Sequence, residues 1–295
     1  MEVKGTLLGI IIVCTVCFIT TTLLIHSKEL SLETNQFLAP KLTRIIAIGD
    51  LHGDFQALQS ILEFSNYKSN DVLVQTGDTV DKGTDTLLLF DYFIENQSPN
   101  IVHLMGNHED MNLRNNLKYV AQGDFDSFGG KQNRKAEFSP SGKYGHYIRR
   151  RNITHQIGDV VFVHGGITPE IAEQFKTLES INSADRNSSV VFKKEGPLWY
   201  RGYARKSEAE ICQDLWKALE ILGAKHMVMG HTTFPEITTK CGSSGIFIDT
   251  GVSRFVEGQY SSLEILQQEG VTYKISALYQ NHQDVKFDIS YPLRL

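Results

Sequence analysis

The sequence predicts an α/β fold in which polar functional residues lie at the ends of strands. Between residues 44 and 105, apolar and mostly β-branched runs alternate with segments of helical spacing. This rhythm predicts parallel strands joined by right-handed crossovers. Five short blocks with Asp, Asn or His each end an apolar run, namely GDLHGD (49–54), GDTVDKG (77–83), GNHE (106–109), VHGG (163–166) and GHT (230–232). Ligand sites of open α/β sheets form at that edge.

The first part of the chain predicts strands and helices in alternation, with strands over 44–48, 71–75 and 101–105 and helices over 54–65 and 84–95. Asp54 has a side chain suited to cap a helix N-terminus. Residues 110–156 interrupt this order, because they are polar and rich in Gly and Asn, with a strand predicted only over 144–148. We interpret 110–156 as an insertion that caps the site.

Strands resume at 160–163, and a second irregular stretch, which we also interpret as a cap insertion, covers about 176–206. Apolar residues then recur at helical spacing over 207–222. A second set of strands follows, over 226–229, 246–249, 261–265 and 271–277. The last two alternate in polarity and are joined around Glu269 and Gly270, which predicts a hairpin.

The N-terminal segment predicts a membrane anchor. Residues 7–25 carry no charged side chain, and about 20 apolar residues suffice to span a bilayer. No convincing small-residue cleavage site follows, which favours an uncleaved transmembrane signal anchor over a long cleaved signal peptide. The predicted organisation is a short tail (1–6), the anchor (7–25), a stalk (26–42) and a catalytic domain (43–295).

Three Asn-x-Ser/Thr sequons, at Asn96, Asn152 and Asn187, lie beyond the anchor and favour a lumenal catalytic domain. Cys212 and Cys241 could pair in such a compartment, or both could be buried free thiols. The net charge of −5 points to no polyanionic partner, so nucleic acid is not an expected ligand. No obligate protein partner is inferred either.

Carboxylate and imidazole side chains at the strand ends predict a two-metal hydrolytic site. Asp50 and His52 suit a first metal, because residues spaced by two at a strand end converge once the chain turns. Asp78 follows the neighbouring strand and is the expected bridging ligand. The second metal and its surroundings are completed by Asn107, His164 and His231. This mixed donor set suits Zn, Fe or Mn better than Ca or Mg.

Two metal ions about 3.5–4 Å apart activate a water and neutralise phosphoryl oxygens, but the departing oxygen still needs a proton. His108 stands next to Asn107 and is left without a metal, so it is the expected general acid. Asp81 is placed to orient His108 by accepting its other ring proton. One such Asp or His alone would more often be a cap or a core residue. Their combination at five strand ends reverses that expectation.

Together the five blocks resemble the GD-x-HG, GD-x-x-D-[RK]-G, GNH-E, HGG and GH signatures of the calcineurin-like metallophosphoesterases, over about residues 44–255. The resemblance implies a four-layer αββα sandwich of two mixed sheets with a dinuclear centre at its edge. It implies one metal on Asp50, His52 and Asp78, and a second on Asp78, Asn107, His164 and His231. It also implies His108 and Asp81 as the catalytic pair and Zn, Mn, Fe or Co as the metals, with Zn favoured.

Three basic residues are candidate phosphate ligands. Lys82 stands where the protein phosphatases of this family usually carry Arg, and its ammonium lacks the planar fork of a guanidinium. The segment PLWYRGY (197–203) is similar to the P-x-W-x-R segment of the Shewanella-like phosphatases, which implies that Arg201 reaches the phosphate. Arg254 is a weaker candidate, because its spacing fits the pattern less securely.

The first insertion has a basic bias that bears on the substrate. Glu137 is the only acidic residue between 131 and 151, against Lys131, Arg134, Lys135, Lys143, Arg149, Arg150 and Arg151, which gives seven minus one, or +6. Lys193, Lys194, Arg205 and Lys206 extend the bias in the second irregular stretch. Such a run is as compatible with a solvated face as with a cleft that concentrates a polyanionic phosphate substrate.

The anchor, the sequons and the basic insertion make the chain similar to the vacuolar zinc-dependent endopolyphosphatases of yeast. The hypothesis is therefore hydrolysis of phosphoanhydride bonds in inorganic polyphosphate by a water activated between two metals. It describes a single-pass protein with a lumenal catalytic domain in the vacuole membrane or another secretory-pathway membrane. The alternatives are a membrane-anchored Shewanella-like protein Ser/Thr phosphatase, a dinucleoside polyphosphate hydrolase, and a metal-binding scaffold without activity.

Overall fold

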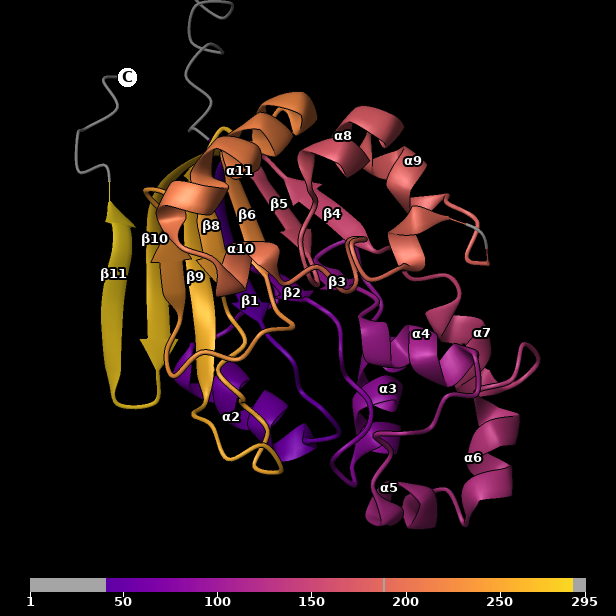
Figure 1. Cartoon of the computed structure of the whole chain (residues 1–295). Helices are drawn as coiled ribbons and strands as arrows, with labels where there is room; N and C mark the ends of the chain where they lie inside the picture. The colour runs from indigo at the N-terminus through magenta and orange to yellow at the C-terminus, as the bar shows by residue number, and fades with distance from the viewer. Residues whose placement is uncertain (1–40, 188, 289–295) are drawn as a thin grey trace, which may run out of the picture. The chain divides into compact units, whose positions relative to one another are not determined.

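The computed structural model of the chain describes residues 41–187 and 189–288 (Figure 1). The predicted tail, anchor and most of the stalk therefore lie outside the described residues. In the part of the chain that is described, no helix is both long and apolar enough to cross a membrane. From Leu42 onward, the described residues form one compact unit.

The first of two β-sheets has the strand order β11-β10-β9-β1-β2-β3. Its strands β1 (Leu42–Ile48), β2 (Val72–Gln75) and β3 (Ile101–His103) pair in parallel, which confirms the expected rhythm. The predicted hairpin is also confirmed, but it adds to this first sheet, antiparallel to β1. The hairpin and the edge strand beside it are β9 (Ser261–Gln268), β10 (Val271–Tyr279) and β11 (His282–Asp288).

The second sheet has the order β4-β5-β6-β8-β7. Its bounds are β4 (Thr154–Ile157), β5 (Val160–Val163), β6 (His226–Met229), β8 (Gly245–Phe247) and β7 (Thr238–Lys240). The three inner strands β5, β6 and β8 run parallel, and the edge strands β4 and β7 run antiparallel to them. The predicted insertion therefore ends before β4, because its last residues pair with β5.

Alternating side chains place the two sheets face to face. On β1, Ile45 and Ala47 pack in one apolar core with Phe162 of β5 and Val228 of β6. Ile46 and Ile48, which point to the opposite face of β1, pack in a second cluster together with residues of the helices. Each fully buried Ile or Phe contributes about 1.5–3 kcal/mol to stability. The sheets thus form the inner layers, and helices cover their outer faces (Figure 1).

The helices begin and end where the sequence indicates. α2 (Phe55–Phe64) starts after Asp54, whose carboxylate accepts from the backbone N–H of Ala57. α11 (Glu208–Leu222) starts with a capping box between Ser207 and Glu210 and ends at a left-handed Gly223. Two further helices beside the sheets are α3 (Thr86–Glu95) and α8 (Pro169–Phe175). These helices anchor the loops that follow the strands.

The first insertion is helical, which sequence analysis did not anticipate. The insertion begins within α4 (Asn107–Leu113), whose first turn belongs to the GNHE block, and continues through α5 (Gln122–Ser127), α6 (Lys131–Glu137) and α7 (Lys143–Ile148). These helices gather around α3 in Figure 1. The strand predicted over 144–148 is wrong. Tyr144, Tyr147 and Ile148 are all buried, and both tyrosine rings contact Phe90 of α3. This i, i+3, i+4 spacing suits one helix face.

The second irregular stretch contains α9 (Leu178–Asn182), a 3₁₀ turn η1 (Val190–Phe192) and α10 (Gly202–Arg205). It leads into α11, where Cys212 forms a disulfide with Cys241, which follows β7. Their Cα atoms are 5.4 Å apart. Of the two alternatives that the sequence left open, the structure therefore has the disulfide.

Candidate metal centre

Six predicted metal ligands converge where strands of both sheets end. Each follows β1, β2, β3, β5 or β6 within a few residues, and none is more than 5% exposed; they are Asp50, His52, Asp78, Asn107, His164 and His231. Because parallel strands end at a common edge, residues distant in sequence meet there. The structure thus brings together all six ligands that the five blocks predicted.

Asp78 lies at the centre of this cluster. Its Oδ2 is 3.3 Å from His164 Nε2, 3.9 Å from His52 Nε2 and 3.7 Å from His108 Nε2. Potential ligand atoms lie within 4.8 Å of one another in two groups, one of His52, Asp78 and His108 and the other of Asp78, His164 and His231. Asp78 belongs to both groups, as a bridging carboxylate should.

Backbone carbonyls orient the ligand histidines. One ring nitrogen of each lies against a carbonyl oxygen, with His52 Nδ1 at 2.9 Å from Val80, His164 Nδ1 at 3.0 Å from Thr76 and His231 Nε2 at 3.1 Å from Trp199. A carbonyl only accepts, so that nitrogen must carry the proton. The other nitrogen then faces the cluster, which is the usual arrangement of metal-binding histidines.

The charges of the cluster also call for cations. Burial raises the pKa of Asp50, and the carboxylate of Asp249 raises it further. Burial lowers the pKa of His164, but Asp78 and Asp50 outweigh it and raise that pKa to about 9. Burial lowers the pKa of His52 to about 3, so this ligand is neutral at pH 7. Divalent metals bind closely spaced buried carboxylates together with imidazoles, and a metal ion would take the place of the proton that these carboxylates favour on His164.

The donor set fits two divalent ions. Asp50, His52 and Asp78 would hold one ion, and Asp78, Asn107, His164 and His231 would hold the other. Imidazole nitrogen with carboxylate and amide oxygen suits Zn, Mn, Fe or Co. Each ion would shift the local pKa values, because it replaces protons as the partner of the carboxylates.

His108 and Asp81 form a buried pair beside the metal cluster. Nδ1 of His108 is 2.8 Å from Oδ2 of Asp81, and Nε2 faces the cluster. Burial lowers the pKa of His108, but the carboxylates of Asp78 and Asp81 outweigh burial and raise it. A protonated imidazole held by a carboxylate is the geometry of a general acid.

Glu109 organises the loops, a role that sequence analysis missed. Its carboxylate accepts from the backbone N–H groups of Asp78 (2.8 Å), Thr79 (2.7 Å) and Gly106 (2.8 Å). Asp78 has a left-handed φ of 58°, which is costly for a non-glycine residue. The hydrogen bonds to Glu109 offset that cost. Its place in the GNHE block was the available signal.

Two glycines allow the loops to approach the carboxylates closely. A Cβ atom at Gly230 would lie 2.5 Å from Oδ1 of Asp50. A Cβ atom at Gly106 would overlap Oδ1 of Asp78. A larger residue at either position would displace a metal ligand, which explains the glycines in these two blocks.

Two of the three candidate phosphate ligands reach the cluster. Nζ of Lys82 is 2.8 Å from Nε2 of His52. Nη2 of Arg201 is 3.3 Å from Nδ1 of His231, and Nη1 donates to the hydroxyl of Thr232 at 2.9 Å. Both cations therefore border the site.

Arg254 is engaged elsewhere. Its Nη2 lies 2.8 Å from Oδ2 of Asp85, its Nη1 donates to Gln56, and its backbone N–H donates to Asp54. These partners belong to the N-terminal ends of α2 and α3. The structure thus does not bring the guanidinium of Arg254 to the metal ligands.

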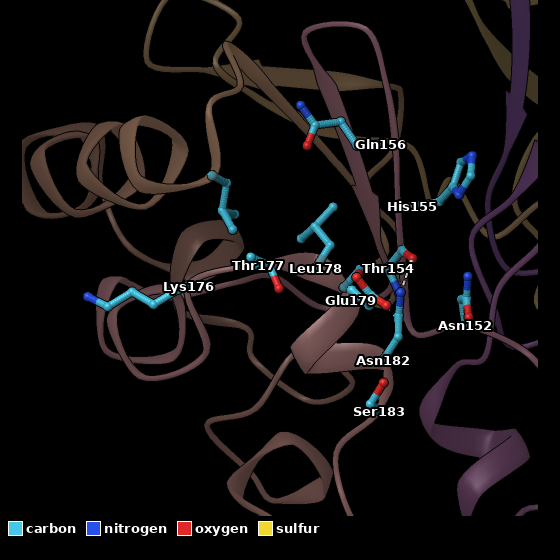
Figure 2. Close-up of a pocket in the computed structure, with 11 residues that line it drawn as sticks. Asn152, Thr154, His155, Gln156, Lys176, Thr177, Leu178, Glu179, Asn182 and Ser183 are labelled. Carbon is cyan, nitrogen blue, oxygen red and sulfur yellow. Dashed lines mark hydrogen bonds between the residues drawn. The ribbon is translucent and has the colours of Figure 1, made fainter.

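A separate pocket of about 500 Å³ lies beside the edge strand β4 (Figure 2). Its lining is mostly polar and includes none of the predicted site residues. Asn182 of α9 accepts there from the backbone N–H groups of Ile153 and Thr154, and it donates to the carbonyl of Thr154. These bonds dock α9 on β4, so the polar groups serve the fold.

Comparison with known proteins identifies the family. The model of the Calcineurin-like phosphoesterase family matches residues 43–237. The chain belongs to this family. Members are phosphoester hydrolases, so the chain is a metallophosphoesterase, as the resemblance of the five blocks implied.

Relatives of this metallophosphoesterase point to one branch. It is 32% identical over 260 residues to an uncharacterised protein of Schizosaccharomyces pombe, covering 77% of this chain and 78% of that one. It is 29% identical over 247 residues to Shewanella-like protein phosphatase 1 of Plasmodium berghei, covering 72% and 68%. A solved cold-active protein-tyrosine phosphatase of a psychrophilic Shewanella species has a TM-score of 0.69 at 25% identity, covering 83% and 80%.

Proposed function

We propose that this metallophosphoesterase is a two-metal protein phosphatase. The carrying observation is the buried His108–Asp81 pair beside a carboxylate shared by two groups of potential ligands. Hydrolysis of phosphoserine, phosphothreonine or phosphotyrosine breaks the P–O bond and expels an alkoxide or phenolate, a basic oxygen anion that requires a proton donor. The relatives named as protein phosphatases support this substrate class.

The residues of this chain have distinct roles in the proposed reaction. Divalent metals bound by the ligand cluster would lower the pKa of a water and neutralise phosphoryl charge. His108 would donate the proton of Nε2 to the departing oxygen, while Asp81 holds its Nδ1–H. Arg201 would offer a planar fork to phosphoryl oxygens, and Lys82 would add a point charge. Both supply positive charge where the transition state is negative.

Inorganic polyphosphate is the second candidate substrate, because of the basic insertion. Several of its cations have structural partners, however. Arg134 is fully buried, Lys143 lies 2.6 Å from Asp91, and Arg149 donates to the carbonyl of Gly145 at 2.9 Å. These contacts leave a smaller free basic surface than the sequence indicated. We therefore rank a phosphoprotein above polyphosphate as the substrate.

We also infer that the catalytic domain works in an oxidising compartment on the lumenal side of a membrane. The Cys212–Cys241 disulfide supports this, since structural disulfides are rare in the cytosol. Asn96, Asn152 and Asn187 are exposed and open to glycosylation. Endoglycosidase should increase the gel mobility of the full-length chain taken from cell membranes. Unchanged mobility together with free thiols at both Cys212 and Cys241 would contradict this compartment.

A substrate panel tests the proposed activity. The full-length chain, loaded in turn with Zn, Mn, Co or Mg, is given a phosphotyrosine peptide, a phosphoserine peptide, long-chain polyphosphate and diadenosine tetraphosphate. We expect phosphate release from a peptide with at least one metal and the slowest turnover with polyphosphate. His108→Asn serves as the inactive control. Cleavage of polyphosphate or the dinucleotide with intact peptides would overturn the proposal.

A further inference from the structure

One arginine of the first insertion reaches the catalytic pair. Arg134 lies on α6, far along the chain from the ligand blocks, within a run of basic residues. Its side chain is fully buried. Buried arginines are rare unless they are paired, so the partners of Arg134 indicate what it does.

Those partners include the carboxylate that holds His108. Nη2 of Arg134 lies 3.0 Å from Oδ1 of Asp81 and 2.8 Å from Oδ2 of Asp124, and Nε is 3.0 Å from the same Asp124 oxygen. Nη1 donates to Oδ1 of Asn112. The guanidinium thus joins α5 and α4 to the loop that carries Asp81.

The two oxygens of Asp81 are thereby assigned to different partners. Oδ1 accepts from Arg134 and from Nδ2 of Asn112 at 3.0 Å. Oδ2 faces Nδ1 of His108 at 2.8 Å. Rotation of the carboxylate would break the contacts of Oδ1, so the insertion fixes the direction from which His108 is held.

Aromatic rings fix the guanidinium in turn. Its Cζ lies 4.5 Å from the ring centroid of Phe138, 5.5 Å from Phe128 and 5.7 Å from Phe125. A planar guanidinium can pack among rings while it bonds several oxygens at once. A lysine ammonium retains the charge but cannot reproduce this set of contacts.

We propose that Arg134 is a positioning residue for the general acid, acting on His108 through Asp81. This inference rests on the proposed function, because it requires His108 to protonate a leaving group. The insertion is then part of the catalytic apparatus as well as a cover. Asp124, which shares the guanidinium with Asp81, balances its remaining charge.

A competing role is purely structural, since Arg134 also compensates the buried Asp124. Leaving groups separate the two roles. A departing phenolate is more basic than 4-nitrophenolate and depends more on a proton donor. Misplacement of His108 therefore slows hydrolysis of phenyl phosphate more than that of 4-nitrophenyl phosphate, whereas partial unfolding slows both equally.

The test measures kcat and KM for both esters with the metal-loaded, full-length chain and its Arg134→Lys and Arg134→Gln variants. For Arg134→Lys we expect kcat on phenyl phosphate to fall about 10–100-fold, as for other supporting residues of active sites. The fall on 4-nitrophenyl phosphate should be several times smaller, with KM little changed. Arg149→Gln is the matched control, because Arg149 donates to the backbone carbonyls of Phe138 and Gly145 in the same insertion.

A double variant shows whether Arg134 acts through Asp81. Adding Arg134→Lys to Asp81→Asn should cost little more kcat than Asp81→Asn alone, because residues acting as one unit are not additive. Equal losses on both esters, or full additivity, would overturn the inference while leaving the proposed function intact. If Arg134→Gln does not fold, Arg134→Lys decides alone. A wild-type chain inactive on both esters overturns the proposed function, and this inference with it.

Discussion

The strand-end loops and the first insertion both act at His108, but in different ways. The loops deliver groups directly, with Asp78 shared between the ligand groups and Glu109 holding the backbone around it. The insertion acts indirectly, because Arg134 contacts Asp81 and Asp81 in turn holds His108. The comparison teaches that the reacting groups lie directly after the strands, on short loops and on the first turn of α4, while a separate helix, α6, sets the direction of His108.

Loss of the central carboxylate should have the largest effect, because it breaks the loop side of this comparison. Asp78→Asn removes the charge shared by both ligand groups, and we expect metal binding to fail and activity to drop by at least about 10³-fold. Metal content per chain and phosphatase rate measure this. Asp91→Asn, which alters a half-buried carboxylate of α3 that is paired with Lys143, is the control. Normal metal content in Asp78→Asn would refute the assigned bridge.

Loss of the general acid should have the second-largest effect, since His108 is the residue on which the strand-end loops and the insertion both act. His108→Asn leaves the six ligands in place, so we expect metal content to stay near wild type. The value of kcat on a phosphoserine peptide should fall by about 10²–10⁴-fold, the usual share of general acid catalysis. A variant that kept full turnover would assign the proton to another group.

The stability of the protein at acid pH tests how the insertion packs against the first sheet, through the contact of His103 with Tyr147. His103 of β3 is buried and contacts the hydroxyls of Thr79 (2.8 Å) and of Tyr147 on α7 (3.0 Å). Burial, with the charge of Arg151, lowers its pKa to about 3. The unfolded chain takes up this proton near pH 6.5, so the stabilising contribution is present above 6.5 and is lost as the pH falls from 6.5 toward 3.

Urea unfolding of wild type and His103→Gln at pH 7 and pH 5 measures this contribution. Between these pH values wild type should lose about 2 kcal/mol more stability than the variant, from roughly 1.5 pH units below the unfolded pKa. Equal losses in both proteins would show that His103 accepts a proton in the folded state.

The smallest effect concerns the fit of one loop. Gly230→Ala places a methyl group against Oδ1 of Asp50 and should shift that ligand without removing it. We expect metal affinity and activity to fall by about 10-fold, at the lower end of effects of supporting residues. Ala224→Gly, an exchange between the same two residue types away from the ligands, is the control. Gly223→Ala is not used because the left-handed φ of 65° at Gly223 would strain an alanine. Unchanged metal affinity would show that the loop accommodates the methyl group.

Local patterns predicted the ligand loops well, because their chemistry depends on residues adjacent in sequence. Asp50, Asp78 and His231 each follow a predicted strand within three residues, so their strand-end position follows from the sequence alone. Arg134 gave no such signal, since its burial depends on Phe138, Asp124 and Asp81 meeting in three dimensions. Read locally, it was one cation in a basic run.

Other differences have similar causes. The segment 144–148 is short and aromatic, which suits a strand as well as a helix, and its packing against Phe90 of α3 favours the helix that the structure has. The final hairpin was recognised by its turn, but the sheet it joins depends on pairing with β1. Arg254 was placed by spacing, whereas its pairing with Asp85 depends on how α3 packs.

Metal titration of the chelator-treated, full-length chain tests the central claim most directly. Zn or Mn is added in steps, and bound metal per chain and hydrolysis of 4-nitrophenyl phosphate are measured on the same samples. Activity should be absent without metal and should saturate at two ions per chain, with Asp78→Asn binding neither. Full activity in the metal-free chain, or saturation at two ions in Asp78→Asn, would contradict the two-metal site built around Asp78.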